Sequence, residues 1–120
     1  MYLFILRRLS VLVIVLMFVA SLANAHAIVV SATPAQNAVV SGPNVPISLK
    51  FNSRIDAKRS RLTLATAGAE PQNLQIVESA PEDSLVSEAK GLKTGAYILR
   101  WQVLASDGHI TRGEVPFNVK

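Results

Sequence analysis

Two places in this chain carry residue types that bind metal ions. The first is Asp107-Gly108-His109, where a carboxylate and an imidazole stand two residues apart around a glycine. The second is His26, which is the only other histidine in the sequence. A carboxylate and an imidazole on one turn can converge on a single ion, but two ligands alone hold a metal weakly. The spacing therefore predicts a metal site that needs further ligands. The alternatives are a plain hairpin turn, for which Asp-Gly is a common choice, and a hydrogen bond between His109 and Asp107, an arrangement that would bind no metal.

The N-terminal segment has the three parts of a secretory signal peptide. Arg7 and Arg8 precede an almost continuous apolar run over residues 9–22, which leads into Ala23-Asn24-Ala25. A basic start, an apolar stretch and an A-x-A site predict cleavage by the general secretion route after Ala25. Residues 1–25 are accordingly interpreted as a signal peptide that directs the protein to the periplasm, and an uncleaved membrane anchor is the alternative.

Cleavage after Ala25 makes His26 the first residue of the mature protein. Its α-amine and its imidazole can then close a chelate ring on one ion, and an α-amine loses its proton to a metal far more readily than a lysine does. With Asp107 and His109 the predicted metal ligands comprise two imidazoles, an amine and a carboxylate. This donor set suits Cu(II) in a tetragonal arrangement, with Zn(II) as the rival ion.

Composition narrows the possible chemistry. The chain has no cysteine, and its two methionines, Met1 and Met17, both lie in the predicted signal peptide. The mature chain thus has no sulfur ligand for Cu(I), and its site should favour the oxidised ion. Without Arg7 and Arg8 it holds ten basic residues against eight acidic ones, a net charge of +2. Such a charge gives no reason to expect nucleic-acid binding.

The residues on both sides of Asp107-Gly108-His109 alternate between apolar and polar types. This pattern predicts two half-buried strands that pair in antiparallel fashion across the turn. Trp101 is the largest apolar side chain in the pattern and is expected in the core. The positions of shared parity are Tyr97, Leu99, Trp101 and Val103 before the turn, and Gly113, Val115, Phe117 and Val119 after it.

The rest of residues 26–120 shows further short strand patterns, broken by Pro and Gly, and no helical periodicity. The segments are residues 27–32, 47–51, 62–66, 74–77 and 85–87. About seven short strands with one buried Trp predict an all-β fold, a single immunoglobulin-like antiparallel sandwich of Greek-key type.

One polar segment has two interpretations. Residues 52–60 are polar and mostly basic, and we expect a solvated loop there. The alternative is a basic patch that binds a phosphate-bearing surface or an acidic partner. Its members would be Arg54, Lys58, Arg59 and Arg61.

Several of these motifs together resemble the CopC family of periplasmic copper-resistance proteins. They are His26 after the A-x-A site, Ser31-Ala32-Thr33-Pro34-Ala35, Leu49-Lys50-Phe51, Gly95-Ala96-Tyr97 and Trp101-x-Val103-x-x-Ser106-Asp107-Gly108-His109-x-x-x-Gly113-x-x-x-Phe117-x-Val119. The resemblance covers essentially all of residues 26–120. It implies a β-sandwich that binds Cu(II) through His26, Asp107 and His109 and transfers copper in the periplasm, alongside a CopD-type inner-membrane copper transport protein.

Two departures from the family pattern bear on the site. Relatives commonly carry an acidic residue shortly after the Leu-x-Phe strand, where this chain has Asn52-Ser53. Some relatives also carry a Met-rich Cu(I) site, which the mature chain lacks. The resemblance is therefore to a member that binds Cu(II) only.

The sequence thus predicts a monomeric, non-enzymatic copper carrier or buffer, soluble once the signal peptide is removed. A metal-free immunoglobulin-like interaction module is one alternative. A copper-dependent oxidase with a histidine-chelated ion is another, although Asp107 would occupy coordination space that oxygen needs.

Overall fold

The computed structural model describes residues 27–120. The predicted signal peptide, residues 1–25, and His26 lie outside the described residues, so cleavage after Ala25 and the role of His26 stay predictions. Within residues 27–120 no helix is long and apolar enough to cross a membrane.

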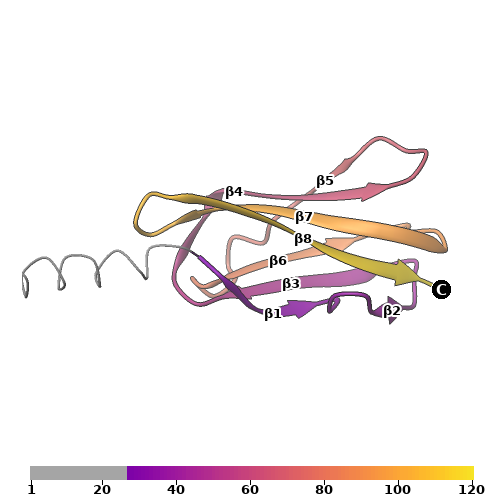
Figure 1. Ribbon diagram of the computed structural model, residues 1–120, viewed down its shortest axis with the longest axis horizontal. Coiled ribbons are helices and arrows are strands. Elements are labelled where there is room, and N and C mark those ends of the chain that lie inside the picture. Colours follow the sequence, from indigo (N-terminus) through magenta and orange to yellow (C-terminus); the bar gives the residue numbers. More distant parts are fainter. Residues whose placement is uncertain (1–26) are drawn as a thin grey trace, which may run out of the picture.

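The strands of residues 27–120 form two sheets that pack face to face (Figure 1). The three-stranded sheet has the order β1 (Val29–Thr33), β3 (Val45–Phe51), β6 (Ser84–Ala89). The five-stranded sheet has the order β2 (Val39–Val40), β8 (Ile110–Val119), β7 (Gly95–Ala105), β4 (Ile55–Thr66), β5 (Gln72–Leu74). Neighbours are antiparallel except β2 and β8, which are parallel. The predicted all-β sandwich is confirmed.

The core lies between the sheets and is built on the predicted alternation. In β7, Leu99, Trp101 and Val103 are buried while Arg100 between them is exposed. The Trp101 ring and the Phe51 ring from β3 pack edge to face, with centroids 5.2 Å apart and planes at 74°. Edge-to-face packing of two large rings adds to the free energy gained from burying their area, so this contact ties the two sheets together.

Gly113 makes room for the Trp101 ring. It lies directly opposite Trp101 in the pairing of β7 with β8, and a Cβ atom there would overlap the indole ring. Close approach of the ring to the strand backbone therefore requires a glycine at this position.

Residues 55–60 are strand, so the prediction of a solvated loop over residues 52–60 was wrong for them. Ile55 pairs with Ala105 at the start of β4, and the register with β7 then shifts between Asp56 and Arg61. The Ser60 hydroxyl fills this irregularity, because it donates to the Asp56 carbonyl (2.6 Å) and accepts the Leu104 N–H (3.3 Å). A strand with such a bulge does not show clean alternation, which hid it in the sequence.

Two smaller differences concern short strands. The pattern predicted a strand at residues 74–77, whereas β5 spans Gln72–Leu74. The sequence pattern also missed β2, which has two residues and exists only through its pairing with the C-terminal end of β8. A two-residue strand is too short to show an alternation of apolar and polar residues in the sequence.

Replacing Gly113 by Ala tests the packing of Trp101. We expect the Gly113→Ala variant to lose about 1 to 3 kcal/mol of unfolding free energy, because the new Cβ forces the ring out of its place. Denaturant unfolding measures the loss, and near-UV circular dichroism reports the Trp101 environment. Asn118→Ala, an exposed site on the same strand, is the control and should change stability by less than about 0.5 kcal/mol. Equal stabilities of the two variants would contradict the packing argument.

Candidate metal centre

Asp107-Gly108-His109 forms the turn between β7 and β8, as the sequence predicted. The Ala105 N–H donates to the His109 carbonyl (2.8 Å), and the Gly108 N–H donates to the Ala105 carbonyl (3.0 Å). Gly108 has a φ of 89°, a conformation that glycine adopts without a steric penalty. The turn thus holds two of the three predicted ligand residues at an exposed tip of the five-stranded sheet (Figure 1).

The Asp107 carboxylate lies against His109 at two points. Oδ1 accepts the His109 backbone N–H at 3.0 Å, and Oδ2 lies 3.0 Å from Nδ1 of the His109 ring. The Asp107 side chain is one-third exposed, while that of His109 is 62% exposed. A carboxylate on one ring nitrogen fixes the orientation of an imidazole, as it does for many metal-ligating histidines. The two side chains that the sequence grouped are therefore close together, but they form the hydrogen bond that was the alternative to metal binding, and this bond must open before both can bind one ion.

Asn52 connects the β3–β4 turn to the beginning of the described chain. Its Oδ1 accepts the Ile28 N–H at 2.9 Å, and its own N–H donates to the Ile28 carbonyl at 2.9 Å. Ala27, one residue earlier, is buried in the core with 1% exposure. This pair of hydrogen bonds, which we call the Asn52–Ile28 clamp, fixes the position from which the chain leads back to His26. The sequence had marked Asn52 only as a departure from the family pattern.

The β3–β4 turn in turn lies beside the β7–β8 turn. The Ser106 N–H donates to the Arg54 carbonyl at 3.3 Å, and Ile55 pairs with Ala105 in the adjoining strands. Figure 1 shows the beginning of β1 and the tip of the β7–β8 hairpin at the same end of the sandwich. Three chain segments thus meet at one end: residues 27–28, residues 52–55 and residues 105–109.

The charge of the neighbouring Arg54 side chain is offset by an acid. Its Nε lies 3.0 Å from Oε2 of Glu82, and both side chains are about three-quarters exposed. An ion pair this exposed contributes little to stability. It does place a carboxylate beside the only cation of the β3–β4 turn, residues 52–54, which lowers the repulsion that a bound metal cation would meet there.

Within residues 27–120, Asp107 and His109 are not joined by a third His, Cys, Asp or Glu that could complete a metal site. A carboxylate oxygen and an imidazole nitrogen fit a borderline divalent ion, but they supply only part of its coordination. The chain has two histidines, so any further imidazole ligand from this chain would have to be His26, which precedes Ala27.

The fold and the turn define a class, the immunoglobulin-like sandwich with potential metal ligands on its end turns, and comparison with known proteins identifies the family. The CopC domain profile matches residues 29–120, so the chain belongs to the CopC family. The predicted resemblance is thereby confirmed. The chain is also 32% identical to copper resistance protein C of Xanthomonas campestris pv. juglandis, over 92% of this chain and 96% of that protein.

Solved structures agree with this assignment. The structure of CopC from Methylosinus trichosporium OB3b matches with a TM-score of 0.71 and 24% identity, over 79% of this chain and 94% of that one. PcoC, a methionine-rich copper resistance protein from Escherichia coli, matches with a TM-score of 0.65 and 27% identity, over 79% and 99% of the two chains. The first likeness supports the fold alone, and the second supports fold and family together.

The Asn52–Ile28 clamp can be tested by removing its side chain. In Asn52→Ala the Ile28 N–H loses its acceptor, and a hydrogen bond worth about 1 kcal/mol predicts roughly fivefold faster exchange of the Ile28 amide. Asn52→Asp keeps an acceptor for the Ile28 N–H, so its Ile28 amide should exchange at a rate close to that of the parent. Amide hydrogen exchange followed by NMR measures both.

The matched control is Asn44→Ala, which removes the same kind of bond at the other end of β3, where Asn44 accepts the Gly91 N–H at 3.3 Å. It should leave exchange at Ile28 unchanged. Equal acceleration at Ile28 in Asn44→Ala and Asn52→Ala would show a general loosening of the sheet and contradict a local clamp.

Proposed function

We propose that this protein is a periplasmic Cu(II) carrier or buffer in copper homeostasis or resistance. Copper is held by the α-amine and imidazole of His26 together with Asp107 and His109. Membership in the CopC family and the likeness to proteins named for copper resistance support this function. The protein acts by binding and releasing the ion, without catalysis.

The observation that carries the proposal is the convergence of chain segments at one end of the sandwich. The Asn52–Ile28 clamp and the bond from Ser106 to the Arg54 carbonyl bring Ile28 and the β7–β8 turn to the same end. His26 precedes Ile28 by two residues, and two residues of chain span at most about 7 Å. This geometry supports a site that His26 completes.

The donor types support Cu(II) as the ion. Two imidazoles, an amine and a carboxylate suit a tetragonal cupric site, and residues 26–120 contain no sulfur ligand. His109 faces Asp107 with Nδ1, so we assign Nε2 as its coordinating nitrogen. Asp107 contributes a carboxylate oxygen to the ion once its Oδ2 leaves Nδ1 of His109 and turns toward the metal.

The exposure of the turn suits a carrier. His109 is largely exposed, so an incoming ligand from another protein can approach the ion without opening the fold. In this proposal a CopD-type inner-membrane copper transport protein is the partner, and the carrier is a soluble monomer. The metal is cargo that the protein exchanges.

The role of the amine is tested by a Cu(II) titration of residues 26–120 with an authentic His26 terminus. We expect one tight equivalent and a nitrogen-rich tetragonal electron paramagnetic resonance spectrum, because amine and imidazole chelate together. The same protein with one extra glycine before His26 keeps the imidazole but loses the amine at that position, and it should bind markedly more weakly. Equal affinity of the two forms would remove the amine from the site.

The roles of Asp107 and His109 are separated by three variants at the β7–β8 turn. Asp107→Asn keeps an oxygen for the His109 N–H but loses the carboxylate, and we expect copper affinity to fall by about 10- to 100-fold. His109→Ala should lower copper affinity at least as much, and its electron paramagnetic resonance spectrum should lose the contribution of one nitrogen ligand. Ser106→Ala, an exposed neighbour, is the control and should bind like the parent. Unchanged binding by His109→Ala would contradict the proposed ligand set.

A further inference from the structure

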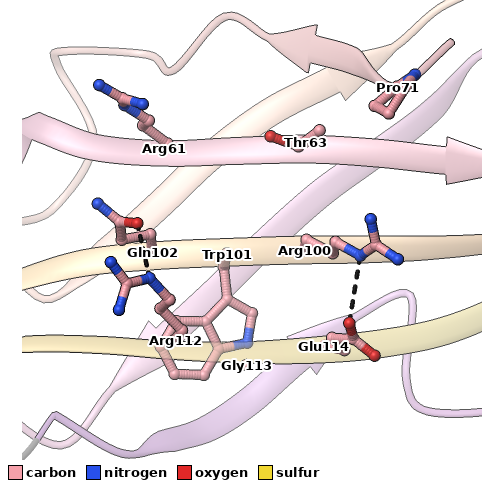
Figure 2. Close-up of a pocket in the computed structure, with 9 residues that line it drawn as sticks. All are labelled: Arg61, Thr63, Pro71, Arg100, Trp101, Gln102, Arg112, Gly113 and Glu114. Atoms are coloured by element: carbon pink, nitrogen blue, oxygen red, sulfur yellow. Dashed lines mark hydrogen bonds and ion pairs between the residues drawn. The ribbon is translucent and has the colours of Figure 1, made fainter.

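Three arginines share the outer face of the five-stranded sheet. Arg61 lies on β4, Arg100 on β7 and Arg112 on β8, and all three are exposed. The register places Arg61 and Arg112 on either side of Gln102, and it places Arg100 between Thr63 and Glu114. Figure 2 shows their side chains on adjacent strands along one shallow groove of about 470 Å³, which Pro71 borders near β5. We call this surface the arginine groove.

Two of the guanidinium groups are held in place from within the groove. Nε of Arg100 donates to Oε1 of Glu114 at 3.2 Å, and Nε of Arg112 donates to Oε1 of Gln102 at 2.9 Å (Figure 2). Both bonds use Nε, so they fix the plane of each group while its four Nη hydrogens point elsewhere. Such pre-orientation lowers the entropy lost when a guanidinium binds an oxyanion.

The groove has a net positive charge. Three arginines face one acid, Glu114, which pairs with Arg100, so the positive charges of Arg61 and Arg112 are not offset by a carboxylate of the groove. In residues 27–120 the Arg61 side chain has neither a hydrogen bond nor an ion pair within the protein. The surface is thus complementary to an anionic ligand.

The spacing of the arginines indicates the shape of that ligand. Arg61 and Arg112 stand two strands apart, about 10 Å between backbones, and Arg100 is displaced along the sheet by two residues, about 7 Å. A compact anion would reach one or two of them. Carboxylates on alternate residues of an extended peptide recur every 6.4 to 6.8 Å or so, which matches the displacement along the sheet.

We propose that the arginine groove binds an extended acidic segment of a partner protein, with carboxylates on alternate residues. An anionic membrane surface fits less well, because the exposed large apolar residues that would insert into lipid lie outside the groove. They are Ile28, Val30, Val39, Val77 and Ile110. Arg112 follows His109 by three residues, about 10 Å along the strand, so the bound segment lies close to the β7–β8 turn. The inference does not depend on copper binding.

The test uses protein purified from cells that express the full chain, labelled with ¹⁵N. The probe is a capped synthetic peptide of alternating Glu and Thr, and the control peptide has Gln in place of Glu. We expect saturable NMR shifts at Arg61, Gln102 and Arg112 with the Glu peptide, weakening as salt rises. The Gln peptide should produce none of these shifts.

Two double variants separate the groove from general basic charge. The variant with both Arg61→Gln and Arg112→Gln should bind the Glu peptide about tenfold or more weakly than the parent. The variant with both Lys58→Gln and Arg59→Gln removes the same charge from β4 outside the groove, and its affinity for the peptide should stay within about twofold of the parent's. If the variant with both Arg61→Gln and Arg112→Gln alters the fold, Arg61→Gln alone tests peptide binding in its place. Equal loss in both pairs, equal binding of the Gln peptide, or binding to phosphatidylglycerol vesicles without binding to the Glu peptide would each overturn the proposal.

Discussion

The edge-to-face contact between Phe51 and Trp101 is the constraint on which the candidate metal centre depends. Each ring comes from a different sheet, and their centroids are 5.2 Å apart in a buried core. Phe51 is the residue immediately before Asn52, and Trp101 lies on the strand that leads into Asp107. Because packed interiors resist deformation, this contact sets the separation of the two turns. Gly113 is the local condition for it, since only a residue without Cβ fits under the indole ring.

The turns themselves combine fixed backbone with exposed side chains. The Asn52–Ile28 clamp holds the N-terminal segment through an amide oxygen, which accepts the Ile28 N–H without adding a negative charge. A carboxylate at this position would accept the same hydrogen bond from the Ile28 N–H and would also add negative charge to the centre. With Asn52 there, Asp107 is the only carboxylate of the proposed ligand set, and the other proposed ligands are nitrogen atoms of the kind that Cu(II) favours.

Local patterns predicted β7, β8 and their turn well, because there every second residue is apolar and the turn residues are typical ones. They failed where a strand is defined by its pairing with a neighbouring strand and not by an alternation of apolar and polar residues. Residues 55–60 are held by Ala105 and by the Ser60 hydroxyl, and β2 exists only beside the end of β8. Asn52 likewise has no local signature of its role, because its partner Ile28 lies 24 residues earlier in the sequence. The arginine groove joins three distant strands, so only the register of the sheet brings its members together.

The same two strands, β7 and β8, serve both surfaces through the alternation of their side chains. Inward residues fix the rings of the core, outward residues form the arginine groove, and the turn between the strands carries Asp107 and His109. A carrier with an exposed ion must release it to the right protein, and an exposed ligand set alone offers little selectivity. Charged surfaces contribute orientation and partner choice more than affinity. In the proposed function, the arginine groove beside the turn would supply that selectivity while Asp107 and His109 remain open to exchange, so the two proposed roles use different residues.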